Sequence, residues 1–235
     1  KNCIFINKNL REVDCVLYND IFTNKNVALN KLANRSKPED YWSLMYTSGT
    51  TGTPKGVVRN HYGYYLMSLV SAIELSIKKK DNALIVMPLC HANSFNFFCA
   101  YIFSGASVSI YSKKSFVPKH FFKLINLNKS NFTSLVPTHY IMLLEYIKKN
   151  KTIKKIEKNF NFMISSAPAR KDTKKDILKY FKSARLFELY GSSESGWVTM
   201  LHPSEQFGQL GTVGKECVGS KPVLILNKNK KEVKD

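Results

Sequence analysis

The sequence has 235 residues, 44% of them hydrophobic and 12% aromatic, a composition that suits one sizeable buried core and argues against disorder. A formal net charge of +19 makes nucleic acid the first partner to consider. The lysines are scattered in short clumps, arginine is scarce, and no helix-turn-helix, RRM or zinc-finger signature occurs. We therefore expect no nucleic-acid partner.

The ends of the chain and its cysteines bear on its origin. The chain starts at Lys1 without a methionine and ends in a charged run, so we expect a fragment of a longer protein. No secretory signal pattern is present at the start. The cysteines are odd in number and never spaced C-x-x-C, which fits reduced, mostly buried thiols and a cytoplasmic location: Cys3, Cys15, Cys90, Cys99 and Cys217.

One long uncharged stretch, between Asp81 and Lys113, could be mistaken for a membrane helix, which needs about 20 apolar residues. Pro88, Gly105 and several polar residues divide it into "ALIVMPL", "SFNFFCAYIF" and "ASVSIY". These pieces are typical of a strand, a helix and a second strand. No membrane span is expected.

Strand and helix patterns alternate along the rest of the chain. "YWSLMY" (41–46) alternates like a strand, and the β-branched pair after residue 56 predicts a second one beyond a loop. Further strands are predicted at 83–87, 107–111, 132–136, 162–165 and 186–189, and further helices at 118–127, 139–148 and 172–181. This order predicts an α/β fold with a mostly parallel β-sheet and flanking helices.

Four polar turns directly follow predicted strands. Ligands of open α/β sheets bind outside the carboxyl ends of the strands, so these turns should converge on one binding edge. They are "PLCHAN" (88–93), "VPTHY" (136–140), "SSAPAR" (165–170) and "LYGSSES" (189–195).

The loop "YTSGTTGTPKG" (46–56) has the chemistry of a phosphate site. Its glycines let backbone N–H groups approach oxyanions, its hydroxyls can donate hydrogen bonds, and Lys55 supplies a mobile cation. It is not a Walker loop, because Thr53 and Pro54 separate Gly52 from Lys55 and no helix follows at once. A flexible surface turn of small polar residues remains the alternative.

These motifs together resemble the adenylate-forming (AMP-binding) superfamily, which includes acyl-CoA synthetases, luciferases and peptide-synthetase adenylation domains. The loop resembles the family signature, and the four turns resemble its P-L-x-H, V-P-T, G-G-A-P and Y-G-x-T-E motifs in order. "GTVGKECVG" (211–219) is similar to the segment that follows. The resemblance covers residues 41–235, part of the large N-terminal domain of that fold, with residues 1–40 as a segment leading into it.

The resemblance implies a two-step reaction with ATP, Mg²⁺ and coenzyme A. A carboxylic acid, expected to be a fatty or other hydrophobic acid, would form acyl-AMP and then pass its acyl group to the coenzyme A thiol. Amino-acid adenylation and a degenerate nucleotide-binding module are the alternatives. The aspartate that binds an amino group in amino-acid adenylation has no counterpart in "NSFNFF". The sequence does not give the oligomeric state.

The resemblance also implies roles for individual residues. His91 and Glu194 would be catalytic, with Glu194 also a Mg²⁺ ligand. Tyr190 would stack on adenine and Ser193 would contact the α-phosphate region. The expected cofactor-binding set is Thr47, Ser48, Gly49, Thr50, Thr51, Gly52, Lys55, Ser166, Ala167, Pro168, Tyr190, Gly191, Ser192 and Ser193.

The chain departs from the family pattern in several places. Ser193 replaces the usual threonine, and Ser165 and Ser166 replace two glycines, which should narrow the pocket. The family's ribose-binding aspartate, hinge and catalytic lysine have no counterpart in these residues. We therefore expect the 235-residue chain alone to be inactive or nearly so.

Overall fold

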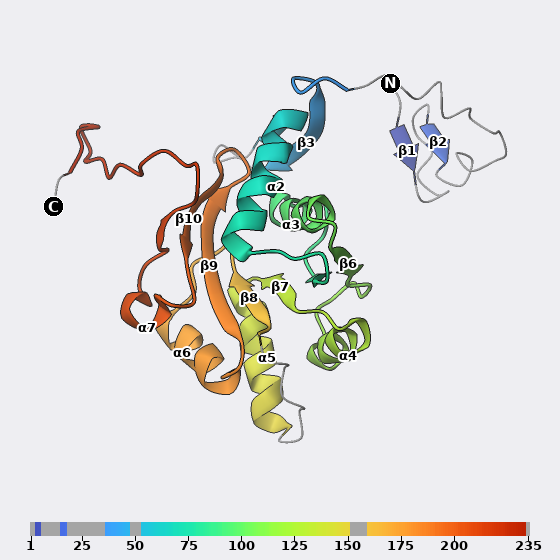
Figure 1. The fold of residues 1–235 in the computed structure, drawn as a ribbon, viewed down its shortest axis with the longest axis vertical. Helices are drawn as coiled ribbons and strands as arrows, with labels where there is room; N and C mark the ends of the chain where they lie inside the picture. The colour runs from blue at the N-terminus through green and yellow to red at the C-terminus, as the bar shows by residue number, and fades with distance from the viewer. Residues whose placement is uncertain (1–2, 6–14, 18–35, 48–52, 151–158, 234–235) are drawn as a thin grey trace. The chain divides into compact units, whose positions relative to one another are not determined.

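The structure is a computed structural model that describes residues 3–5, 15–17, 36–47, 53–150 and 159–233. It divides into two compact units, Lys1–Lys37 and Pro38–Asp235. In the first unit, β1 (Cys3–Phe5) and β2 (Cys15–Leu17) form a short parallel pair. The second unit contains the remaining helices and strands (Figure 1).

The second unit opens with an antiparallel hairpin of β3 (Tyr41–Thr47) and β4 (Lys55–Asn60), which confirms the predicted strand, loop and strand. Thr47 pairs with Lys55 where the hairpin loop begins. Helix α2 (His61–Leu75) follows β4 directly, because the Asn60 side chain caps it by accepting a hydrogen bond from the Gly63 N–H at 2.8 Å. The sequence patterns did not predict this helix.

A seven-stranded sheet forms the centre of the unit, in the order β11-β10-β9-β8-β7-β5-β6. Strands β5 to β9 run parallel, and β10 and β11 extend the sheet antiparallel. The predicted α/β fold with a mostly parallel sheet is confirmed. The strands are β5 (Asn82–Ile85), β6 (Ser107–Ile110), β7 (Phe132–Leu135), β8 (Asn161–Ile164), β9 (Arg185–Ser192), β10 (Gly196–Leu201) and β11 (Lys215–Glu216).

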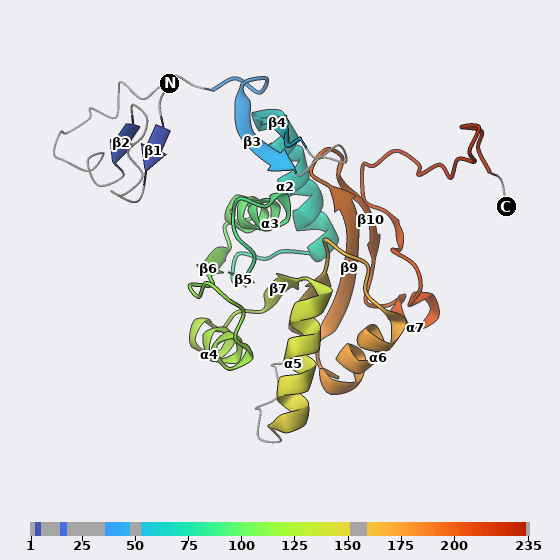
Figure 2. The same ribbon diagram turned by 180° about the vertical axis from the view of Figure 1, so that it is seen from behind.

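Helices cover both faces of this sheet, as Figures 1 and 2 show from opposite sides. The segment between Asp81 and Lys113 forms strand, helix and strand as predicted. Across the described residues, no helix has the length and apolar character needed to cross a bilayer. Besides α2, the helices are α3 (Ala92–Phe103), α4 (Pro118–Asn128), α5 (Pro137–Lys149), α6 (Lys171–Tyr180) and the short α7 (Gln206–Gln209).

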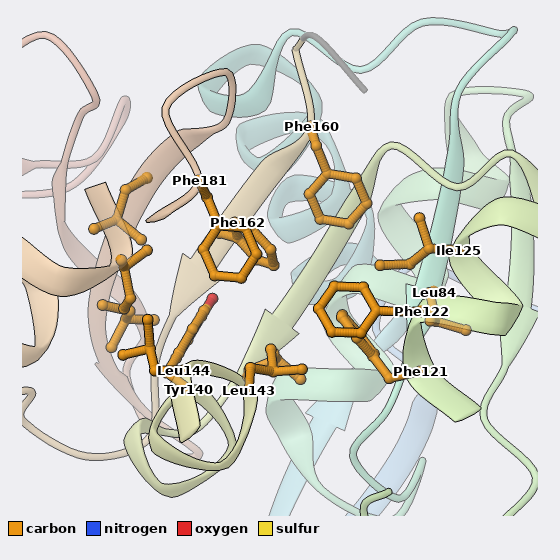
Figure 3. Close-up of a cluster of buried hydrophobic side chains, with 14 of the residues drawn as sticks. Leu84, Phe121, Phe122, Ile125, Tyr140, Leu143, Leu144, Phe160, Phe162 and Phe181 are labelled. Atoms are coloured by element: carbon orange, nitrogen blue, oxygen red, sulfur yellow. The ribbon is translucent and has the colours of Figure 1, made fainter. Parts of the chain in front are cut away.

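The strands bury side chains on both faces, which explains their nearly continuous apolar sequences. In β8, Phe162 and Ile164 join the cluster under α4, α5 and α6, whereas Met163 joins the cluster under α2 and α3. Figure 3 shows the first cluster, in which Tyr140 of α5 packs edge-on against Phe162. The Tyr140 hydroxyl donates to the Met163 carbonyl at 2.8 Å, so this buried phenol is satisfied.

Most predicted strand boundaries differ from the structure by one or two residues, and the largest difference is at the end of β9. β9 was expected to end at residue 189 but continues to Ser192, because β10 pairs with it antiparallel as far as Gly196. Tyr190 and Gly191 therefore lie in a strand, and only the end of "LYGSSES" turns. A Cβ at Gly191 would collide with the Gly196 carbonyl oxygen, so glycine allows this close pairing.

A buried ion pair fastens α6 to the sheet beside this strand. Lys174 contacts Glu188 of β9, and their side chains are 2% and 5% exposed. Lysine and glutamate are almost never buried this deeply without a partner. The pair therefore fixes α6 against the strand that leads into Tyr190 and Gly191.

Breaking this pair should destabilise the fold. We expect Lys174→Met to lower the free energy of unfolding by about 3–5 kcal/mol, because Glu188 is left buried and unpaired. The double variant Lys174→Met/Glu188→Leu should recover most of that loss. Urea denaturation followed by circular dichroism measures both.

The matched control is Lys148→Met, which breaks the exposed 2.9 Å pair with Asp176 between α5 and α6. Exposed pairs contribute little, so this variant should unfold nearly as the unsubstituted chain does. A Lys174 variant no less stable than the Lys148 variant would contradict the assigned role of the buried pair.

Candidate nucleotide and acyl site

Arg59 joins the hairpin to the edge of the sheet. Its Nε and one terminal nitrogen donate hydrogen bonds to the Ser193 carbonyl oxygen at 3.2 and 2.6 Å. Arg59 lies on β4, and Ser193 lies in the turn between β9 and β10. Two segments 134 residues apart in the sequence are thereby held side by side.

Thr47 and Lys55 pair with each other where β3 and β4 meet the loop that resembles a phosphate site. The Thr47 hydroxyl donates to the Lys55 carbonyl oxygen at 3.5 Å, and the Lys55 side chain is exposed. No ion pair to Lys55 occurs within the described part of the chain. The expected phosphate-binding residues Ser48, Gly49, Thr50, Thr51 and Gly52 lie outside the described residues.

The turn after β9 is closed by its own hydroxyls. The Ser195 N–H donates to the Ser192 hydroxyl at 3.0 Å, and the Ser192 N–H donates to the Ser195 hydroxyl at 3.2 Å. Glu194 is exposed and forms no ion pair or hydrogen bond with the residues the structure describes. Tyr190 is 55% exposed, so its ring is accessible to a stacking partner.

A cavity of about 300 Å³ lies beside this turn and brings together residues from the predicted turns. Five of the expected site residues line it: His91, Ser166, Gly191, Ser192 and Ser193. Thr47, Lys55, Ala167, Pro168, Tyr190 and Glu194 do not line it. The full lining is Met87, His91, Ala92, Asn93, Asn96, Ser165, Ser166, Leu189, Gly191, Ser192, Ser193, Gly196 and Trp197.

The four turns lie at one edge of the sheet, as predicted, because β5, β7, β8 and β9 run parallel, but only three of them share this cavity. "PLCHAN", "SSAPAR" and "LYGSSES" reach this cavity, but "VPTHY" does not. His139 of that turn lines a second cavity of about 390 Å³, together with Pro88 and Leu89. Burial lowers the pKa of His139, so its imidazole is neutral near pH 7. Met87 lines both cavities.

A polar network ties the strand ends together at the cavity. The Asn93 amide nitrogen donates to the Ser165 hydroxyl at 2.5 Å and to the Ser166 hydroxyl at 3.3 Å. The Ser134 hydroxyl donates to the Asn93 amide oxygen at 3.1 Å and lies 2.8 Å from the Ser165 hydroxyl. The network links α3 to the ends of β7 and β8.

The two serines that replace glycines are accommodated differently. The Ser165 side chain is 3% exposed and is used in the network. Ser166 has φ 68°, in the left-handed region that favours glycine. Both line the cavity, in keeping with the expectation that serine side chains would take up space there.

His91 is placed at the cavity by the start of α3. It is the N-cap residue of that helix, its side chain makes no capping hydrogen bond, and it is exposed. Its neighbour Cys90 is an exposed free thiol. Burial raises the pKa of Cys99, also on α3, to about 11, so that thiol stays protonated near neutral pH.

A metal ion at this site would depend on few protein ligands. Among the described residues there is no group of three or more His, Cys, Asp or Glu side chains able to hold one. Glu194 is an exposed carboxylate that has no partner in the parts of the chain that the structure describes. This fits Mg²⁺, which keeps several waters and takes one or two carboxylates plus substrate phosphates.

Sequence reasoning missed several residues of the site. Arg59 had a weak signal, as an arginine four positions beyond Lys55 in a lysine-dominated chain. Asn93 was inside a recognised motif but had no predicted role. Ser134, Asn96 and Trp197 had no signal, because only the fold brings them to the cavity or its network.

Comparison with known proteins shows the family to which this chain is similar. The profile of the AMP-binding enzyme family matches residues 7–235. A 2-succinylbenzoate–CoA ligase of Bacillus subtilis (strain 168) is 29% identical over 174 residues, which are 74% of this chain and 34% of that protein. A 4-hydroxybutyrate–CoA ligase 2 of Metallosphaera sedula is 32% identical over 108 residues, 46% of this chain and 19% of that protein.

Solved structures give the same result for the fold. An o-succinylbenzoate CoA synthetase from Bacillus subtilis, in complex with an acyl-adenylate intermediate, has a TM-score of 0.76 at 21% identity. The match covers 95% of this chain and 44% of that one. This chain thus spans about a third of the length of the first curated relative. With the family profile matched from residue 7 to residue 235, the chain belongs to the AMP-binding enzyme family.

Proposed function

We propose that this chain provides the nucleotide and acyl site of an ATP-dependent acid–thiol ligase. A carboxylate oxygen attacks the α-phosphorus of ATP, the bond from that phosphorus to the bridging oxygen breaks, and pyrophosphate leaves with the electron pair. The thiol of coenzyme A then displaces AMP from the acyl carbon. The observation that carries the proposal is the Arg59–Ser193 contact, which holds the hydroxyl- and glycine-rich hairpin beside the Tyr190–Glu194 segment.

The first step brings a carboxylate to a polyanion, so the site must offset negative charge and hold the reactants in line. Lys55 is available for the phosphates, because it is exposed and unpaired in the described part of the chain. Thr47 and the loop residues after it would add hydroxyl and N–H donors. Tyr190 would stack on the adenine, with Ser166, Ala167 and Pro168 beside it.

Glu194 is the residue that would hold Mg²⁺. When bound, the ion offsets charge on the phosphate oxygens. Glu194 itself contributes a carboxylate that no described cation neutralises. Ser192 and Ser195 close the turn around it and hold its backbone in place.

The acid would occupy the 300 Å³ cavity, with His91 near the reacting carboxylate. Curated relatives are named for different acids, among them 2-succinylbenzoate, 4-hydroxybutyrate and 4-coumarate. This range supports acid–CoA ligation as the reaction class without selecting one acid. Amino-acid adenylation is disfavoured, because the described cavity lining contains no carboxylate to bind an amino group.

We expect this chain to bind nucleotide through Lys55, Tyr190 and Glu194. Binding is therefore the informative measurement for this chain. Isothermal titration calorimetry with ATP and Mg²⁺ tests the proposal, and heat consistent with one site per chain is the expected result.

Glu194→Ala should weaken ATP binding about tenfold in the presence of Mg²⁺, because the metal loses its protein carboxylate. The same variant should bind metal-free ATP, with EDTA present, as well as the unsubstituted chain does. Glu145→Ala, which removes an exposed carboxylate from α5, is the control and should leave both affinities unchanged. Equal loss with and without Mg²⁺ would remove Glu194 from the metal site.

Arg59→Met should also weaken ATP binding about tenfold, because the hairpin is no longer held against the Ser193 carbonyl. The matched control is Arg185→Met, since Arg185 lies at the other end of β9 and hydrogen-bonds Asn161 at 2.7 Å. Calorimetry on both variants should show the loss for Arg59 only. Equal affinities for the two variants would show that the Arg59 contact does not organise the nucleotide site.

A further inference from the structure

Two mostly buried side chains at the cavity carry polar groups that have no hydrogen-bond partner among the described residues. Asn96 of α3 is 8% exposed, lines the cavity, and its carboxamide bonds to none of the described residues. Trp197 of β10 is 6% exposed, lines the same cavity, and its indole Nε1 is buried without a partner. The Trp197 ring packs on Phe97, the residue after Asn96, with ring centroids 5.3 Å apart.

Of the two, the Trp197 nitrogen is fully buried, and such atoms in native proteins are almost always hydrogen-bonded. A buried donor without a partner costs about 1–3 kcal/mol. Asn96 lies one turn along α3 from Asn93, whose carboxamide is fully used by serines. The same helix thus carries one satisfied and one unsatisfied asparagine, and both line the cavity.

Resting on the proposed function, we infer that the acid activated here carries a second, uncharged oxygen, a hydroxyl or carbonyl, that hydrogen-bonds to Asn96. The Asn96 amide can donate to this oxygen or accept from its hydroxyl. The hydrocarbon between the two ends of the acid would pack on Met87, Leu189 and the Trp197 ring.

The cavity lining favours an uncharged oxygen over a second carboxylate. None of its described lining residues is a lysine or arginine. The nearest guanidinium, that of Arg59, lines a smaller pocket shared with Asn96 and is bound to the Ser193 carbonyl. A carboxylate would therefore be buried without a charge partner, at a high cost.

The size of the cavity favours a compact acid. Small-molecule sites range from about 300 to 1,000 Å³, and this cavity, at about 300 Å³, is at the low end. Trp197, one of its lining residues, is backed by the buried ring of Phe97. A long unsubstituted acyl chain would offer no oxygen to Asn96 and would not suit the small size of the cavity.

The test uses acyl-adenylate mimics, because their binding does not depend on turnover. Acyl-sulfamoyl-adenosines made from 5-hydroxypentanoate, hexanoate and glutarate have similar lengths and differ in the distal group. By isothermal titration with this chain, the hydroxyl form should bind at least about tenfold more tightly than the other two. Equal affinities, or tighter binding of the hexanoyl or glutaryl form, would overturn the inference while leaving the proposed function intact.

Asn96→Leu identifies the residue responsible. It should abolish the preference, weakening the hydroxyl form about tenfold and leaving the hexanoyl form unchanged or tighter. Asn126→Leu, an equivalent change on the exposed side of α4, should retain the preference. A preference that survives in the Asn96 variant would overturn the assignment to Asn96. Binding of none of the three mimics by the unsubstituted chain would overturn the proposed function, and the inference would fall with it.

Discussion

The arrangement of the site depends on the two hydrogen bonds from Arg59 to the Ser193 carbonyl oxygen. A two-stranded hairpin is marginally stable by itself and has no fixed position relative to a sheet. Arg59 supplies that position with a rigid, planar pair of donors. The consequence is local: β4, the strand that follows the loop rich in hydroxyls and glycines, is held beside the turn that carries Glu194. Under the proposed function, this contact between segments 134 residues apart would allow a single site to contact the two ends of a nucleotide.

The sheet contributes the other half of the site through its strand ends. Parallel strands β5, β7, β8 and β9 end on the same edge. The network of Asn93, Ser134, Ser165 and Ser166 locks three of the adjoining segments together. The buried Lys174–Glu188 pair fixes the helix behind β9. Preorganised polar groups of this kind are what a reaction between two anions requires, because they need not reorganise when charge moves.

The sequence predicted those parts of the fold that depend on local pattern. The parallel strands, the helices between them and the hairpin follow from apolar periodicity, which neighbouring residues determine. Helix α2 was missed because its apolar residues are mixed with exposed aromatic ones such as Tyr62 and Tyr65. The extension of β9 to Ser192 was missed because it depends on pairing with β10.

The site residues also fall into two groups, those that a sequence motif indicates and those that only the fold brings to the site. His91 and Ser193 could be proposed from motifs, and both line the cavity. Ser48 to Gly52 were proposed from the same motifs but lie outside the described residues. Arg59 and Asn96 could not be proposed, because their roles depend on what the fold places opposite them. Motif residues indicate the shared chemistry, whereas these individual contacts are expected to decide which acid this chain accepts.

The most direct measurement of the central claim is a crystal structure of this chain with Mg²⁺ and a non-hydrolysable ATP analogue. The account predicts triphosphate density between the 47–55 hairpin loop and the Ser193–Glu194 turn, with Lys55 toward the phosphates and the base against Tyr190. Density at the second cavity, or a nucleotide that contacts the hairpin without reaching the β9–β10 turn, would contradict it.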